Sequence, residues 1–285
     1  MSPSQDTSRQ SRPFKARMFA IESLLFLAVQ GIGLWVGWSL LNRGYASYGG
    51  AGESIITFLL AFLFATVVII LLLKFLKNPI FFKGLMAFLI FVGAQTVFAV
   101  PFPEIVAALI AVELLILHFR FANVFTQNIS IMLAVAGVGA SLGMILPVSA
   151  IIVILLVLSL YDYIAVYRTK HMVTMFHGLL DKGVPMSLVV PDKASGVVSD
   201  VQDVVPGTGK YLILGTGDIA FPVIFAVSAL NYSIIHSLGV VVGSFFGLLV
   251  VHWILTKRAK GAVPALPPIS ILAILGFMLV QLMGV

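Results

Sequence analysis

Residues 148–167 read VSAIIVILLVLSLYDYIAVY, a run of 20 residues that is almost entirely apolar until Asp162 interrupts it. A helix needs roughly 20 apolar residues to cross the hydrocarbon core of a bilayer, so the stretch predicts a membrane-spanning helix. A carboxylate at that depth costs at least about 2–3 kcal/mol, so it is retained for a reason such as transport, pairing or catalysis. The segment therefore predicts a membrane fold and marks Asp162 as a candidate functional residue.

The rest of the chain has the same apolar character. Of its 285 residues, 60% are hydrophobic and 10% are charged, and the mean hydropathy is +1.13. A water-soluble fold of this length needs a larger charged shell to cover its core. The absence of cysteine excludes disulfides, thiolate metal sites and a cysteine nucleophile. The net charge of +6 lies in short clusters between apolar runs, so it indicates membrane topology rather than nucleic-acid binding.

Apolar segments of spanning length recur along the sequence. About nine can be distinguished, and we therefore predict an all-α polytopic membrane protein. They lie near residues 18–41, 54–76, 79–99, 104–118, 125–146, 148–167, 211–230, 233–256 and 264–284.

Basic residues predict the orientation of these spans, because Lys and Arg in short loops are held on the cytoplasmic side. With nine spans, the basic leader, the connection around residues 74–83, Arg120 and the cluster 257–260 all fall on one side. The opposite loops contain few basic residues, such as Arg43. The pattern predicts a cytoplasmic N-terminus and an outside C-terminus.

One connection differs from the others, because it is long, polar and mixed in charge. It divides the chain into four expected parts: a disordered basic cytoplasmic leader, a six-helix membrane part, a cytoplasmic loop and a three-helix membrane part. Their bounds are 1–17, 18–167, 168–210 and 211–285. Within the loop, the β-branched runs 188–190 and 204–205 are expected to pair as strands when a partner is present.

A second intramembrane carboxyl group matches the first. Asp162 lies six residues before Arg168 on a helix descending to the cytoplasm, and Asp218 lies eight residues after Lys210 on the next helix, which rises from it. At ~1.5 Å per residue, both lie roughly 10 Å inside the same face and can meet. Repulsion and desolvation would then make the pair share one proton. One carboxyl could activate water while the other protonates an amide oxygen; the structural alternative is a pair that only joins two helices.

The backbone near both carboxyl groups is also unusual. Gly215 and Gly217 remove side-chain bulk just before Asp218, which permits close approach of another backbone. The last span begins PALPP at residues 264–268, and its three prolines bar a regular helix there. Irregular backbone at membrane depth is tolerated only where protein or a water-filled cavity surrounds it. Counted from Lys260, this break lies close to the level of the two aspartates.

Three elements stand in order: LYD at 160–162, LGTGD at 214–218 and PALP at 264–267. Together they resemble the presenilin and signal peptide peptidase family of intramembrane aspartyl proteases, whose signatures are YD, GxGD and PAL. The resemblance implies that Asp162 and Asp218 form the catalytic dyad, with neither a metal nor another cofactor. The residues that it assigns to shaping the active site and contacting substrate are Tyr161, Gly215, Thr216, Gly217, Pro264, Ala265 and Leu266.

The resemblance covers the second half of the chain in sequence and the first half only in the number of spans. Thr216 replaces the leucine common in GxGD, and the loop 168–210 is short for a presenilin, which suggests a compact microbial homologue. We therefore expect a multi-pass protein of a microbial cell membrane, with its active site near the cytoplasmic side. Its expected partners are transmembrane proteins or peptides as substrates and the lipid bilayer, not nucleic acid, and a homo-oligomer is compatible with the interpretation.

A transmembrane substrate must unwind before water can attack it, because all its peptide groups are hydrogen-bonded. We hypothesise that the strand-prone stretch before Tyr211 and the proline-rich start of the last span pair with the opened substrate strand.

Three other functions fit part of the sequence. A proton- or ion-coupled transporter also uses intramembrane aspartates and broken helices, but these would be expected in both halves of the chain, whereas only the second half has them. The run 139–143 fits the GxSxG pattern of serine hydrolases, with His236 as its base, yet serine in a small-residue packing face is far commoner. A metalloprotease lacks its HExxH motif here, and His236 and His252 lie roughly 24 Å apart on one helix.

Two further acidic residues lie within predicted spans. Glu22 lies about one turn inside the first span, and we interpret its side chain as reaching the interface. Glu113 is interpreted as a neutral group hydrogen-bonded to a neighbouring helix.

Overall fold

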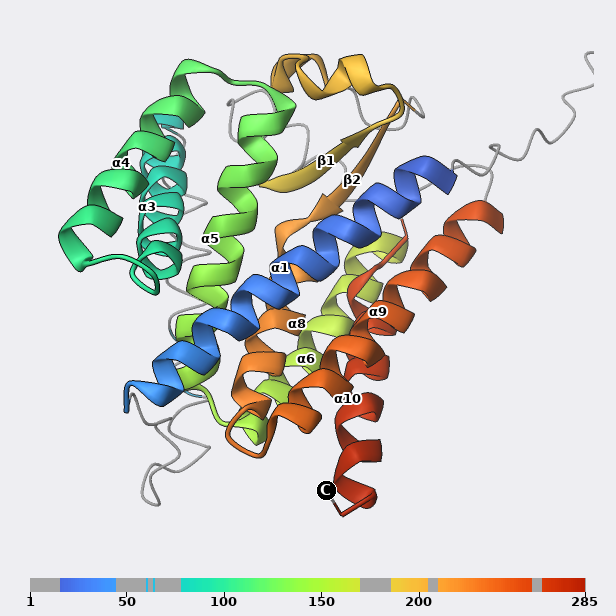
Figure 1. The fold of residues 1–285 in the computed structure, drawn as a ribbon. Helices are drawn as coiled ribbons and strands as arrows, with labels where there is room; N and C mark the ends of the chain where they lie inside the picture. Colours follow the sequence, from blue (N-terminus) through green and yellow to red (C-terminus); the bar gives the residue numbers. More distant parts are fainter. Residues whose placement is uncertain are drawn as a thin grey trace, which may run out of the picture.

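The computed structural model describes residues 16–44, 60, 64, 78–169, 186–204, 210–257 and 263–284, and these form a largely helical protein (Figure 1). Its helices are α1 (Ala16–Asn42), α3 (Pro79–Phe98), α4 (Glu104–Arg120), α5 (Val124–Ile145), α6 (Val148–Ile164), α8 (Thr216–Ala229), α9 (Ile234–Lys257) and α10 (Leu266–Leu282). A π-helical turn, Ala165–Thr169, extends α6, and two short 3-10 helices cover Ala194–Val197 and Val201–Asp203.

Five helices are long and apolar enough to cross a membrane: Ala16–Asn42, Ile80–Phe98, Val124–Ile145, Val148–Tyr167 and Ile234–Lys257. Helices α8 and α10 are apolar but shorter. Eight of the nine predicted segments therefore contain a helix, and the second, 54–76, lies outside the described residues apart from Leu60 and Phe64. The helices are those expected of a polytopic membrane protein.

The seventh predicted segment, 211–230, is not helical throughout. Its first five residues form strand β2 (Tyr211–Gly215), which pairs antiparallel with β1 (Ser187–Pro191). The periodicity of a short apolar run is compatible with a strand or a helix. Residues 211–215 form a strand because they pair with β1. The strand predicted at 188–190 is confirmed, but its partner is β2 rather than the run 204–205. Val204 ends a 3-10 helix, and Val205 lies outside the described residues.

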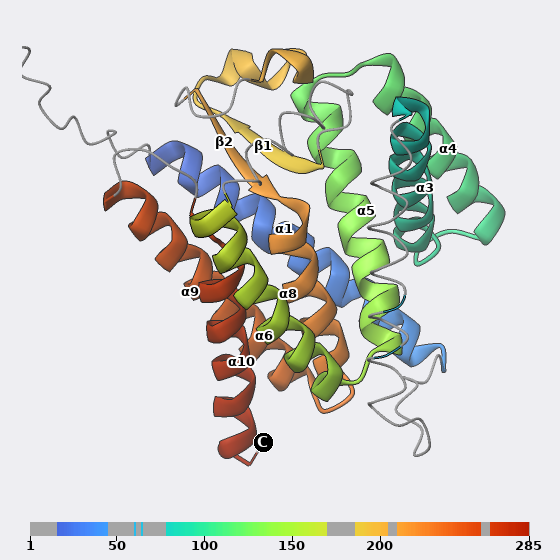
Figure 2. The same cartoon turned by 180° about the vertical axis from the view of Figure 1, so that it is seen from behind.

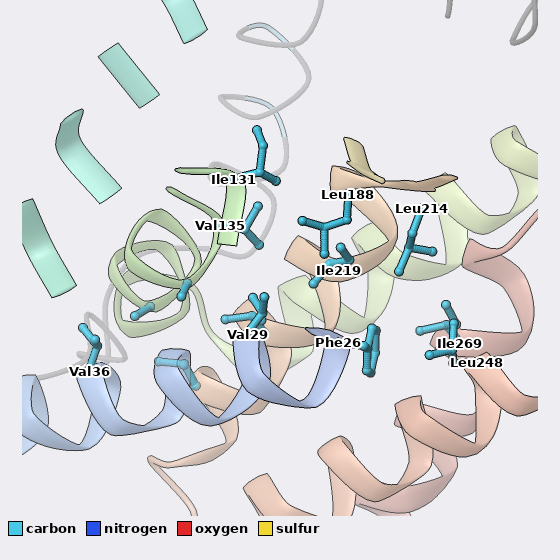
Figure 3. Packing of buried hydrophobic residues seen from close by; sticks show 14 of the residues in the cluster. Phe26, Val29, Val36, Ile131, Val135, Leu188, Leu214, Ile219, Leu248 and Ile269 are labelled. Carbon is cyan, nitrogen blue, oxygen red and sulfur yellow. The ribbon is translucent and has the colours of Figure 1, made fainter. Parts of the chain in front are cut away.

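Helix α8 occupies the centre of the fold. It contacts α1, α5, α6, α9 and α10 (Figures 1 and 2). Its residues Ile219, Val223 and Phe225 are fully buried. Because α8 is apolar on all sides, burial within a bundle is its stable position. Ile219 belongs to one buried cluster with Phe26 and Val29 of α1 and with Leu188 and Leu214 of the two strands, and Figure 3 shows these five side chains in the same region of the core. The core thus fixes the junction between β2 and α8.

Glycines allow the helices to approach closely. A Cβ atom added to Gly137 of α5 would lie 2.0 Å from the backbone oxygen of Gly93 of α3. On α9, Gly239, Gly243 and Gly247 recur every four residues and face the backbone of α10. Such small-residue stripes are typical of packed transmembrane helices, since lipid supplies no hydrophobic force between them.

Candidate active site

Asp218 lies in the first turn of α8, directly after β2. Gly215 caps the helix, and the carboxyl group of Asp218 folds back over it: a Cβ atom at Gly215 would lie 3.1 Å from Oδ2 of Asp218. Few real Cβ contacts are that short, so the first glycine of the GTGD sequence leaves room for the carboxyl group. Pro222 lies inside α8, four residues later, and has no N–H to donate to the carbonyl of Asp218.

Thr216 ties this helix start to the other strand. Its backbone N–H and its hydroxyl both donate to the carbonyl oxygen of Met186, at 3.4 and 3.3 Å. Met186 directly precedes β1, so the sheet continues into the first residue of α8. The position of the first turn of α8 is therefore coupled to β1.

Asp162 lies near the end of α6, and the PAL segment contacts it. Residues 263–265 are not helical, and α10 begins at Leu266, whose backbone N–H donates to Oδ2 of Asp162 at 3.3 Å. Pro267 follows in the first helical turn, where a missing N–H costs nothing because that turn has no internal acceptor. The helix break predicted from the prolines is thus present. It leaves the backbone N–H of Leu266 without an acceptor inside the helix, so this N–H can donate to the carboxyl group of Asp162.

The two aspartates lie together. Helices α6 and α8 are in contact, and the carboxyl groups of Asp162 and Asp218 are near enough to interact electrostatically. Both residues are half-buried, so protein surrounds them largely while part of each residue stays accessible. An acid and a base that act through water need this combination of proximity and access.

A third carboxyl group, which the sequence interpretation had placed at the interface, lies at the same site. Glu22 of α1 is only 5% exposed and interacts electrostatically with Asp218. The interface interpretation is therefore wrong. The available signal was helical periodicity, because Phe26 and Val29 follow Glu22 at intervals of four and seven residues on the same face and are fully buried.

An apolar cavity of about 630 Å³ borders the start of α8 beside Asp218. Its walls come from α3, α5, α6 and α8, and Thr216 and Gly217 lie among its lining residues. The second glycine of the GTGD sequence therefore borders open space, in contrast to Gly215, which contacts the carboxyl group.

The remaining predicted residues lie in different surroundings. Ala265 and Leu266 are buried, whereas Tyr161 is 68% exposed on the outside of α6. Glu113 is exposed on α4 and is not hydrogen-bonded to a neighbouring helix within the described part of the chain, so that interpretation is wrong.

The GxSxG run does not form a hydrolase site. The hydroxyl of Ser141 donates to Gly137 of its own helix, at 3.1 Å. The ring of His236 interacts instead with Ser233 and Gln281. Gly139 and Gly143 pack against α8, which confirms the run as a packing face. Across the described ranges, no group of three or more His, Cys, Asp or Glu side chains could hold a metal ion.

Comparisons with known proteins agree with this architecture. A family model described as signal-peptide peptidase, presenilin aspartyl protease matches residues 25–285. Two solved structures of a presenilin family intramembrane aspartate protease are similar. One, in space group C222, has a TM-score of 0.59 and 22% identity and covers 90% of this chain and 94% of its own. The other, in space group P2, has a TM-score of 0.62 and 24% identity. The match covers 92% of this chain and 96% of that structure's chain.

A search among curated proteins gives no match. The solved structures show the fold, and the family match extends over most of the sequence, including all three elements quoted above. The chain therefore belongs to the signal-peptide peptidase and presenilin family of intramembrane aspartyl proteases.

Proposed function

We propose that the protein hydrolyses peptide bonds of transmembrane helices with Asp162 and Asp218 as a dyad of the GxGD type. The observation that carries the proposal is the convergence of the two carboxyl groups, one of which accepts the Leu266 N–H. In this mechanism, one carboxylate takes a proton from the attacking water, and the other carboxyl donates a proton to the substrate carbonyl oxygen. Charge develops on that oxygen in a site largely shielded from water, where such donation is most effective.

The sheet suggests how the substrate is held. β2 pairs with β1 along one edge, and its other edge faces away from β1. Because β2 leads directly into Asp218, an unwound substrate strand added at this edge would pass the carboxyl groups. This replaces the hypothesis that the stretch 204–205 pairs with substrate.

The apolar cavity also supports binding of a transmembrane substrate beside β2. Most of the side chains that line it are apolar, and Thr216 and Gly217 at the start of α8 are among its lining residues. Apolar side chains of a transmembrane substrate can fill it while the backbone unwinds beside β2.

The proposed setting follows from the sequence pattern: nine spans, a cytoplasmic N-terminus, an outside C-terminus and an active site near the cytoplasmic side of a cell membrane. The division into a leader 1–17, a six-helix part 18–167, a loop 168–210 and a three-helix part 211–285 belongs to the same proposal. A transporter is not favoured, because the chain belongs to a protease family.

The direct test incubates purified protein with a helical transmembrane peptide. Asp162→Asn and Asp218→Asn keep the side-chain shape, and each should lower the cleavage rate at least about 100-fold because the acid or the base is lost. Glu113→Gln is the matched control, since it makes the same kind of change on an exposed face of α4. Cleavage by either aspartate variant at the wild-type rate would contradict the proposal.

Strand addition has its own test, Ile213→Pro. The N–H of Ile213 points away from β1, so proline removes the outer donor without removing a β1–β2 hydrogen bond. We expect kcat/KM for a helical peptide to fall about tenfold, mostly through KM. The Ile213 side chain also packs against the buried cluster that contains Val189, so Ile213→Ala, which keeps the N–H, is the control for lost packing. An unchanged KM would show that the substrate does not pair with this edge.

A further inference from the structure

The outer edge of β1 is occupied by a side chain of α5. The amide of Asn128 donates through Nδ2 to the carbonyl oxygen of Val189 at 2.8 Å and accepts the N–H of Val189 through Oδ1 at 2.9 Å. These are the two hydrogen bonds that a residue of a neighbouring strand would make. A single side chain therefore stands where a third strand would lie.

The register of the sheet explains why Val189 needs such a partner. Val189 is opposite Ile213, and the hydrogen bonds at both ends of the pairing involve the even-numbered positions 186 and 192. Hydrogen-bonded and non-hydrogen-bonded positions alternate in antiparallel pairs, so the N–H and C=O of Val189 point away from β2. Without Asn128, both groups would be left unpaired in a largely apolar environment, where each costs about 1–3 kcal/mol.

The space beside the outer edge of β1 is not completely filled by packed side chains. A cavity of about 200 Å³ lies against this edge between α1 and α5, and Asn128 and Val189 are among its lining residues. Arg17 and Lys193 also border the cavity. An unprotected strand edge beside open space can accept an extended segment.

The edge of β2 is different. Ile213 presents the corresponding N–H and C=O on the far side of the sheet, and neither has a hydrogen-bond partner within the ranges that the structure describes. Among the described residues, the sheet therefore has one edge closed by a side chain and one edge without a hydrogen-bond partner, and the second edge belongs to the strand that leads into Asp218.

We propose that Asn128 is a positioning residue that closes the outer edge of β1, so that an extended substrate segment adds only at β2. The inference rests on the proposed function and deepens it. Asn128 also fixes β1 on α5, and β1 in turn holds Thr216 through Met186. The register of an added strand relative to the carboxyl groups is thereby set from α5.

The register decides which substrate bond is cut, because successive residues of a strand point to opposite faces. A slip of one residue would exchange the two faces of the substrate, whereas a slip of two keeps them. Loosening the sheet should therefore produce additional cleavage sites displaced by two residues.

The test compares Asn128→Leu, which keeps the branching of the side chain but loses both hydrogen bonds, with Ser141→Ala on the same helix. The hydroxyl of Ser141 donates to the carbonyl oxygen of Gly137 in its own helix, away from the sheet, so its variant should keep the wild-type kinetics. With a helical transmembrane peptide, Asn128→Leu should raise KM about tenfold and leave kcat nearly unchanged. Mass spectrometry of the products should show the new sites two residues from the original one.

A second variant covers the case in which Asn128→Leu does not fold. Asn128→Asp keeps the acceptor for the Val189 N–H but places an oxygen against the Val189 carbonyl oxygen in place of the donor, so KM should rise again, with the same displaced products. Wild-type KM and products in both variants would overturn the inference, as would a loss of kcat that only follows the folded fraction. If the wild type itself shows no cleavage that depends on Asp162 and Asp218, the proposed function is wrong, whatever the Asn128 variants do.

Discussion

Asp218 and Gly215 are separated by one turn, and the carboxyl oxygen of Asp218 lies close to the place where a side chain at position 215 would begin. The 3.1 Å separation leaves a methyl group tight against Oδ2. Glycine at this position is therefore explained by space for the carboxyl group, since no positive φ is required there.

Gly215→Ala should consequently lower kcat about tenfold, because displacement of a reacting group by a fraction of an ångström is costly. KM should change little, since the added methyl group meets the carboxyl group rather than the substrate. Gly31→Ala is the control, as a Cβ atom there meets nothing within 4 Å. Steady-state kinetics on both variants check the expectation, and equal kcat values would contradict it.

Glu22 adds a third carboxyl group to the dyad. Groups that interact strongly titrate as a set, so the pH dependence of kcat/KM in the wild type should require three apparent ionisations. Glu22→Gln has nearly the same shape and removes one of them, so its profile should reduce to a simple bell defined by two groups.

Glu113→Gln serves as the matched control and should leave the wild-type profile unchanged, because Glu113 is exposed on α4. Superimposable profiles for wild type and Glu22→Gln would show that Glu22 does not titrate together with the dyad.

The contact between α9 and α10 positions the segment that binds Asp162. Gly243 faces the backbone of α10, and a Cβ atom there would lie 2.1 Å from the carbonyl oxygen of Leu272. A backbone atom cannot move aside as a flexible side chain can. The two helices would have to separate, and the N–H of Leu266 would move with α10.

Gly243→Ala should therefore lower the free energy of unfolding by about 1–3 kcal/mol, as overpacked cores do. Thermal unfolding in detergent measures the loss, and kcat should fall as well because the hydrogen bond to Asp162 is disturbed. Gly84→Ala on α3, where the added Cβ atom meets nothing within 4 Å, should have neither effect. A stable, active Gly243→Ala protein would contradict the packing argument.

The topology of the whole molecule can be tested cleanly because the chain has no cysteine. Ser195→Cys places a thiol in the expected cytoplasmic loop, and Ser47→Cys places one in the first loop expected on the opposite side. A membrane-impermeant maleimide applied to intact cells should label Ser47→Cys and leave Ser195→Cys unlabelled until the membrane is opened. The reverse pattern would show that the orientation inferred from the basic residues is wrong.

Local properties of the chain were enough to predict most of the helices and to single out Asp162 and Asp218. Hydropathy over some 20 residues identifies a span, and an aspartate within a span is conspicuous wherever it occurs. The equal depth predicted for Asp162 and Asp218 counts residues 211–215 as helix, and that part of the prediction is wrong. These residues form a strand, which rises ~3.3 Å per residue instead of ~1.5 Å.

Hydropathy and local motifs thus sufficed for the membrane class, most of the spans and the two aspartates, because those features depend on residues close together in the chain. The arrangement around the aspartates came from packing between distant segments. Leu266 reaches Asp162 across 104 residues, and Asn128 reaches Val189 across 61. Glu22 joins the site because α1 packs against α8. Such contacts depend on which helix faces meet, and local patterns do not specify that.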